Sequence, residues 1–277
     1  MEKPKDSKIQ IDLALSGSGV RLGGHIGGLL ALQELNFEPV RVVATSGGAI
    51  IGGFYAAGFD PKKIRDIFWE LDLSKLKAFA PWLLLTKRAI FSYAKLKQFL
   101  FSFIGNKTLA ELPLYLGTVA YDTKSDSEIL LDKFSCGSVK AVDAILASAC
   151  IPYYFGSIKM RHPTTGQVWK LTDGGIINNY PISILKSNRR LIGLWIQGKG
   201  QEKEKHWWDI FQYDKSIIGA LLDTSSHKHI KSNYWEQTVP IIIKDISAID
   251  FNLTKKQKEQ MMQIGYEAVM NKFKGNQ

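Results

Sequence analysis

The first sixty residues repeat a pattern in which a short apolar run is followed by a turn and a helical stretch. Residues 9–15 (IQIDLAL) form the first apolar run, the glycine-rich turn 16–19 follows, and residues 25–35 have the spacing of a helix. Residues 40–44 form a second apolar run, and the small residues of 47–58 predict a second helix. Apolar strands that alternate with helices are typical of a parallel sheet covered by helices. The pattern therefore predicts an α/β fold, with three α/β/α layers and a mainly parallel central sheet.

The rest of the chain predicts hairpins, further strands and further helices. Asp60 followed by Pro61 is a favourable helix start, because the carboxylate can accept from free amides and proline has no N–H to satisfy. That helix is expected to run through Trp69, and a later one from a cap at Ser138 through Ala147. The remaining expected elements are hairpins at 116–121/128–131 and 157–160/167–171, strands at 191–196 and 239–243, and helices at 210–222 and from Thr254, the last with an inward face of Met261, Ile264, Ala268 and Val269.

We expect one domain over residues 9–277, preceded by a polar tail at 1–8. The chain has no repeat period, and its glycines and prolines are spread out rather than concentrated in a linker. Residues 74–105 mix lysine with aromatic and aliphatic side chains. This mixture is more typical of a cap or lid than of a core, so the segment is a candidate cap.

The sequence favours a cytoplasmic protein without a metal or another cofactor. The N-terminal residues lack the apolar segment of a secretory signal, and apolar runs such as 82–85 are far shorter than the roughly 20 residues that cross a bilayer as a helix. Cys136 and Cys150 have no spacing typical of a disulfide framework or a metal site. The histidines form no HExxH motif; they are His25, His162, His206, His227 and His229.

The formal net charge of +10 raises the question of an anionic partner. A nucleic-acid-binding protein concentrates Lys and Arg in a stripe or a recognisable module, whereas here they are diffuse, so we expect no nucleic-acid partner. The same positive field attracts a protein to anionic lipid, and residues 75–103 and Trp207–Trp208 are candidates for a peripheral membrane contact. Solvated lysines and core packing are the alternative interpretation. The sequence does not indicate an oligomeric state.

Ser46 is the strongest candidate nucleophile. A serine hydroxyl needs a base to take its proton and a position that projects toward the substrate. A sharp turn from strand to helix, flanked by small residues in a GxSxG pattern, provides that position. Residues 44–48 read ATSGG, so Ala44 replaces the first glycine and the rest of the pattern is kept. The amino terminus of the predicted helix also places free amides and a favourable dipole beside Ser46.

A glycine-rich loop follows the first predicted strand and is a candidate oxyanion hole. Backbone N–H groups that cluster in such a loop stabilise the negative charge that develops on an attacked carbonyl. The loop Gly17–Arg21 and Ser46 both follow strands that are expected to be parallel neighbours. Since the carboxyl ends of neighbouring parallel strands lie at one edge of a sheet, we expect the loop and Ser46 to meet.

Five segments, in this order, resemble the patatin-like phospholipases. They are Leu15–Arg21, His25–Gly27, Thr45–Ala49, Ala147–Pro152 with Phe155, and Asp173–Pro181, within a resemblance that covers residues 9–196.

The resemblance implies a patatin-like fold and a Ser-Asp dyad without a catalytic histidine. Ser46 would attack the ester, and Asp173 would act as the base. Gly17, Ser18 and Gly19 would form the oxyanion hole, with Arg21 as a supporting residue. It further implies a lipid acyl hydrolase, of the phospholipase A or lysophospholipase type, that acts on lipid or phospholipid esters and requires no metal.

Other interpretations remain open at this stage. Ser18, Leu22 and Ala44 stand where the family has glycines, which would suit a lipid-binding or scaffold protein with a weakened site. A nucleotide-binding loop is disfavoured, because Leu22 occupies its third glycine position and no acidic residue ends the second strand. His25 is the histidine nearest the loop in sequence, either as a member of a triad or, as we prefer, packed beneath the loop at the helix start.

Overall fold

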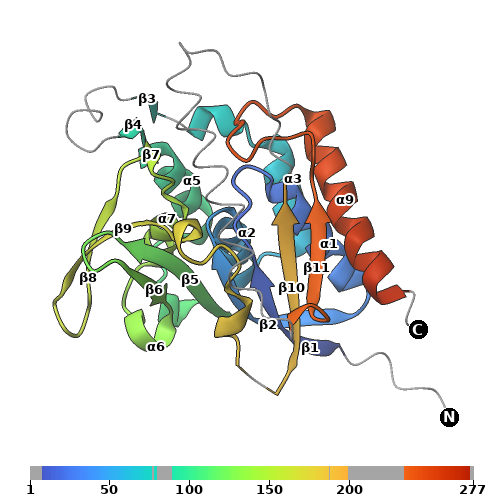
Figure 1. Ribbon diagram of the computed structural model, residues 1–277, viewed down its shortest axis with the longest axis horizontal. Coiled ribbons are helices and arrows are strands. Elements are labelled where there is room, and N and C mark those ends of the chain that lie inside the picture. Colours follow the sequence, from blue (N-terminus) through green and yellow to red (C-terminus); the bar gives the residue numbers. More distant parts are fainter. Residues whose placement is uncertain (1–7, 77, 80–88, 187, 199–233, 275–277) are drawn as a thin grey trace.

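Figure 1 shows a computed structural model, which describes residues 8–76, 78–79, 89–186, 188–198 and 234–274. Within these residues, an eight-stranded sheet has the order β11-β10-β1-β2-β5-β9-β8, with β6 paired to β5. The strands are β1 (Ile9–Leu15), β2 (Phe37–Thr45), β5 (Tyr115–Asp122), β6 (Ser127–Leu131), β8 (Ile158–Arg161), β9 (Val168–Asp173), β10 (Arg190–Gln197) and β11 (Thr238–Ile242).

The five strands from β11 to β5 are parallel, and β6, β9 and β8 add antiparallel pairs at the β5 side. The α-helices of the described residues are α1 (Leu22–Glu34), α2 (Gly47–Ala56), α3 (Pro61–Glu70), α5 (Ala94–Ile104), α6 (Lys133–Cys136), α7 (Ala141–Ala149) and α9 (Lys255–Phe273). The structure confirms the predicted α/β fold, a mainly parallel central sheet flanked by helices, and both predicted hairpins.

Strand residues alternate between two clusters of buried side chains. Leu13 and Leu15 of β1 belong to the larger cluster, which packs against α1, α2, α7 and α9. Ala14, between them, belongs to a smaller cluster on the opposite face, where the 3₁₀ helix η4 (Pro181–Ile184) packs against β1 and β2. Within the described residues, no helix is long and apolar enough to cross a membrane.

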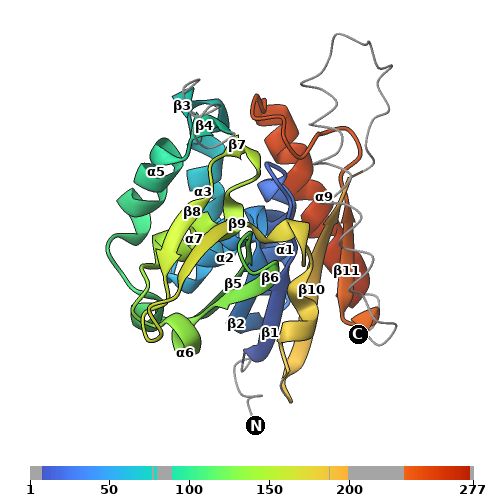
Figure 2. The ribbon, with the colours of Figure 1, turned by 60° about the vertical axis from the view of Figure 1, so that its left-hand side comes forward.

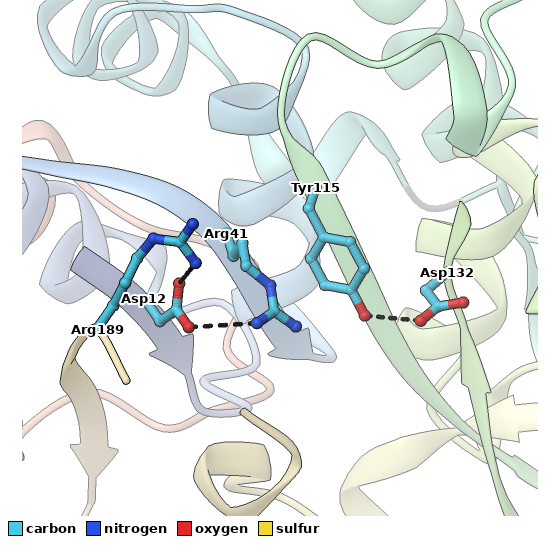
Figure 3. A network of polar contacts seen from close by, with 5 residues as sticks. All are labelled: Asp12, Arg41, Tyr115, Asp132 and Arg189. Atoms are coloured by element: carbon cyan, nitrogen blue, oxygen red, sulfur yellow. Dashed lines mark hydrogen bonds and ion pairs between the residues drawn. The ribbon is translucent and has the colours of Figure 1, made fainter. Parts of the chain in front are cut away.

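The opposite face also carries a network of polar side chains, drawn in Figure 3. Asp12 is buried in β1, and its carboxylate lies 3.4 Å from Nη1 of Arg41 and 3.8 Å from Nη1 of Arg189. The Arg41 guanidinium lies over the ring of Tyr115, whose hydroxyl donates to Asp132 at 2.7 Å. The network therefore ties β1, β2 and β5 together through side chains as well as through the backbone ladder.

Helices α1 and α9 approach each other closely, side by side at the right of Figure 1. A Cβ atom on Gly27 would lie 1.8 Å from the carbonyl oxygen of Met262, and one on Gly265 would lie 2.0 Å from that of Gly24. This contact corrects the predicted inward face of α9. Met261 and Val269 are buried, but Ile264 and Ala268 are only partly buried, because Gly265 faces α1.

Two predicted helix starts also differ from the structure. α1 begins at Leu22, before the predicted residue 25, because Gly23 and Gly24 are helical but carry no apolar side chain that the pattern would reveal. α7 begins at Ala141 after an N-cap at Lys140, so Ser138 is not the cap. Residues 139 and 140 instead pair with residues 108 and 109, as in the Thr108–Lys140 bridge, which delays the helix.

A small sheet lies beyond the carboxyl ends of the parallel strands, at the top of Figures 1 and 2. It contains β3 (Ala78–Phe79), β4 (Ala89–Ser92) and β7 (Tyr153–Phe155). β3, β4 and α5 come from the segment 74–105, for which a cap function stays a prediction. The predicted helix at 210–222, Trp207–Trp208, and the histidines at 206, 227 and 229 lie outside the described residues.

Candidate active site

Ser46 lies at a sharp turn between β2 and α2. Its backbone angles, φ 53° and ψ −123°, fall in a region that residues other than glycine rarely adopt. Non-glycine residues persist there only where the surrounding structure enforces the conformation, and such sites are often functional. Ser46 is 2% exposed. The strand-to-helix turn predicted from residues 44–48 is therefore present, with Ser46 at its apex.

The hydroxyl of Ser46 donates a hydrogen bond of 2.6 Å to Oδ2 of Asp173. Asp173 ends β9, a strand that pairs antiparallel with β5, and β5 is the parallel neighbour of β2. The other carboxylate oxygen, Oδ1, accepts the N–H of Gly175 at 2.7 Å. Sheet topology thus brings together two predicted residues that are far apart in sequence.

Asp173 is fully buried, and burial raises its pKa from 3.8 to about 7. The hydrogen bonds from Ser46 and Gly175 stabilise the carboxylate and lower the pKa, but less than burial raises it. A pKa near 7 is well matched to proton transfer at neutral pH, because the group can both accept and return a proton.

The glycine loop packs directly against the turn that holds Ser46, as its position after β1 predicts. A Cβ atom on Gly47 would lie 2.4 Å from both the carbonyl oxygen of Gly19 and Oγ of Ser18. The loop itself is held by Arg21, which is buried and whose Nε donates to the carbonyl of Ser18 at 3.2 Å. It is also held by the β11–α9 connection, because the N–H of Val20 donates to the carbonyl of Ala248 at 2.8 Å.

The amides of this loop are not equivalent. The N–H of Gly17 donates to the carbonyl of Asn179 at 2.7 Å and is therefore engaged. Among the residues that the structure describes, the amides of Ser18, Gly19 and Gly47 have no protein acceptor. Gly17 instead permits close packing, since a Cβ there would lie 1.9 Å from Oδ1 of Asn179. The sequence did not single out Gly47 as a donor, although the first amides of any helix lack an intrahelical partner.

His25 lies beneath the loop, as the preferred interpretation of the sequence predicts. Its Nε2 donates to the carbonyl of Ser16 at 2.8 Å, and its side chain is fully buried. Burial lowers the pKa of His25 to about 4, so the ring is neutral at pH 7. The Ser46 hydroxyl donates its hydrogen bond to Asp173 and not to the His25 ring.

Two of the departures from the glycine pattern, Leu22 and Ala44, lie near other glycines. Leu22 begins α1, and its Cδ2 would lie 3.0 Å from a Cβ on Gly47, so glycine at 47 leaves room for the leucine. The methyl group of Ala44 lies 3.4 Å from where a Cβ on Gly52 would be, an ordinary contact. The sharp turn at Ser46 thus forms with alanine at position 44.

Comparison with known proteins matches a range of the chain that contains all five segments quoted for the resemblance. The family model described as patatin-like phospholipase matches residues 13–186. Protein YqhO of Bacillus subtilis is 26% identical, with 92% of this chain and 95% of that protein covered. VipD of Legionella pneumophila has a TM-score of 0.64 at 15% identity, covering 97% of this chain and 67% of VipD. ExoU of Pseudomonas aeruginosa, in its complex with SpcU, has a TM-score of 0.56 at 14% identity, covering 98% of this chain and 52% of ExoU. VipD and ExoU therefore share the fold of this chain.

Proposed function

Because the chain belongs to the patatin-like phospholipase family, we propose that it is a lipid acyl hydrolase that works through Ser46 and Asp173. Family membership supports lipid hydrolysis in general, and we propose specifically the cleavage of ester-linked acyl chains, of the phospholipase A or lysophospholipase type. The observation that carries the proposal is the 2.6 Å hydrogen bond between the hydroxyl at the strained turn and the buried carboxylate.

The reaction would proceed in two halves. In the first, the Asp173 carboxylate takes the Ser46 proton while Oγ attacks the ester carbonyl, and the protonated Asp173 then gives that proton to the departing alcohol. In the second, Asp173 takes a proton from water, the hydroxide attacks the acyl-serine, and the proton returns to Ser46 as the fatty acid leaves. A pKa near 7 suits both transfers.

The negative charge on the attacked oxygen would be stabilised by backbone amides. The N–H groups of Ser18, Gly19 and Gly47 are the available donors, and Arg21 would hold the loop in place through the Ser18 carbonyl. Gly17, a predicted member of the oxyanion hole, would contribute close packing because its own amide is bonded to Asn179.

The proposal is tested with the purified protein, phospholipid vesicles and a fluorophosphonate probe. We expect release of free fatty acid from the vesicles and a single covalent adduct, located by mass spectrometry on the peptide that contains Ser46. Prior labelling should abolish fatty acid release, while heat-denatured protein should not be labelled. Vesicle binding without adduct or product would instead indicate the lipid-binding or scaffold function.

A substitution in the loop gives a second prediction. Gly19 has φ +56°, and a Cβ there would lie 2.0 Å from the carbonyl oxygen of Ala248, so Gly19→Ala must displace the loop. Because removal of one oxyanion donor typically costs about 10²-fold or more in kcat, a loss of that size is expected. Ser18→Gly keeps the amide and is the matched control, with kcat expected within about threefold of wild type. Steady-state hydrolysis of a short-chain ester gives kcat for both variants. Equal kcat for Gly19→Ala and wild type would show that the loop does not stabilise the transition state.

A further inference from the structure

The last turn of α7 contacts both members of the proposed dyad. It belongs to the segment 147–152, which the family resemblance includes but to which neither the sequence nor the proposed mechanism gives a function. Ser148 lies in this turn and is fully buried. Helix α7 packs against α2, which follows Ser46, and against β5 and β9, the second of which ends at Asp173.

The backbone N–H of Ser46 needs a hydrogen-bond acceptor that neither the β2–β5 ladder nor helix α2 supplies. The ladder between β2 and β5 ends at Thr45, and the φ of 53° takes Ser46 out of the strand before α2 begins. A buried N–H without an acceptor costs about 1–3 kcal/mol. The Ser148 hydroxyl oxygen is that acceptor, at 3.0 Å from the Ser46 nitrogen.

The same turn holds the strand that carries the carboxylate. The carbonyl oxygen of Cys150 accepts the N–H of Asp173 at 3.0 Å and the hydroxyl of Thr172 at 2.7 Å. One side of the turn therefore fixes the backbone of the nucleophile, and the other fixes the backbone of the base. Helix α7 is itself tied to the sheet, because the Thr118 hydroxyl donates to the Ala144 carbonyl at 3.1 Å.

We propose that Ser148 is a positioning residue, whose hydroxyl holds the strained turn at Ser46 so that Oγ meets the carboxylate of Asp173. The inference rests on the proposed function and assigns to that same site a further residue. Ser148 contacts the backbone nitrogen of Ser46, whereas Oγ of Ser46 is hydrogen-bonded to Asp173. Ser148 acts through the backbone of Ser46, and α7 sets the separation between the two reacting side chains.

The test compares three substitutions at Ser148 with a matched control. Ser148→Ala removes the acceptor, Ser148→Cys keeps a side chain of similar size that accepts hydrogen bonds only weakly, and Ser148→Thr keeps the hydroxyl. Thr118→Val is the control, because it removes another buried hydroxyl that contacts α7 without touching Ser46. For each variant, Tm, kcat and KM on a water-soluble short-chain ester, and the second-order rate of fluorophosphonate labelling are measured.

Ser148→Ala is expected to lower kcat and the labelling rate about 10²-fold, the typical effect of misplacing a reacting group by about 1 Å. KM should change less than about threefold, because no substrate contact is lost. Ser148→Cys should show a similar loss, so the result does not depend on whether the alanine variant folds, and Ser148→Thr should recover most of the activity. Thr118→Val should lower Tm while keeping kcat and the labelling rate near wild type.

Two results would overturn the inference. If the wild type is active and Ser148→Ala and Ser148→Cys match its kcat and labelling rate, the hydroxyl positions nothing. If Thr118→Val lowers kcat as much as Ser148→Ala does, the decrease results from a general loss of α7 packing and not from the missing Ser148 hydroxyl. A wild-type protein that neither hydrolyses esters nor reacts with the probe would instead overturn the proposed function, and this inference with it.

Discussion

Replacing Ser46 with alanine is expected to lower kcat for ester hydrolysis by about 10⁴-fold or more. Without Oγ no acyl-serine can form, and stabilisation by the backbone amides alone would remain. Fluorophosphonate labelling should disappear as well, because the probe reacts with the same oxygen. Fatty acid release from vesicles and intact-mass spectrometry measure the two effects.

Ser46→Gly separates the loss of the nucleophile from the strain of the turn. It also removes Oγ, so its activity should be as low as that of Ser46→Ala. Glycine, however, adopts φ near +53° without steric cost, so Ser46→Gly should have a higher Tm than Ser46→Ala. If the alanine variant keeps activity within about tenfold of wild type, another residue is the nucleophile.

Asp173→Asn is expected to lower kcat by about 10³- to 10⁴-fold, because the amide can hold the Ser46 hydroxyl but cannot take its proton. In the wild type, only the carboxylate form of Asp173 is a base. Burial raises its pKa to about 7, so kcat/KM should rise with pH up to about 7 and level off above it. A pH series of initial rates measures this profile, and a flat profile from about pH 5 to 9 would exclude Asp173 as the base.

The same substitution should change how stability depends on pH. Because the folded state raises the pKa of Asp173 above 3.8, folding favours the protonated form, and this contribution is lost as pH rises from about 4 to 7. The asparagine side chain of the variant does not titrate, so the variant has no such loss. The Tm of Asp173→Asn minus that of wild type should therefore be larger at about pH 8 than at about pH 5. A difference that shrinks with pH would contradict a buried carboxylate with a raised pKa.

His25→Gln is the control for the identity of the base. Glutamine can donate to the Ser16 carbonyl as His25 does, so the loop should keep its support. For His25→Gln, kcat/KM should still rise with pH up to about 7, as in the wild type. The reason is that the pKa of His25 is about 4 and that the Ser46 hydroxyl is hydrogen-bonded to Asp173. A fully active Asp173→Asn together with an inactive His25 variant would replace the dyad with a triad.

The alternation of apolar runs and helices was enough to predict the fold, because strands buried on both faces read as continuous apolar segments. The meeting of Ser46 with the glycine loop followed from their common place at the carboxyl ends of neighbouring parallel strands. Asp173 came from the family resemblance and not from the pattern. β9 is antiparallel to β5, and no local signal in residues 168–173 shows which strand it pairs with.

Contacts between distant segments could not be predicted in this way. The acceptor for the Ser46 amide comes from Ser148, the acceptor for the Gly17 amide from Asn179, and the contact that closes the loop from Ala248. Ser148 and Asn179 lie in segments that carry the family resemblance, but no local signal pairs them with Ser46 or Gly17, and Ala248 lies outside the resemblance. The cytoplasmic location, the peripheral membrane contact and the cap at 74–105 stay predictions.

The contact between Val20 and Ala248 bears on when this protein first becomes able to act during its own synthesis. The loop and the turn leave the ribosome early, but the segment that holds the loop follows roughly two hundred residues later, about 10–40 s at common elongation rates. β1 likewise has one open edge until β10 emerges. A nascent chain would therefore carry Ser46 long before Ala248 is present to hold the neighbouring loop.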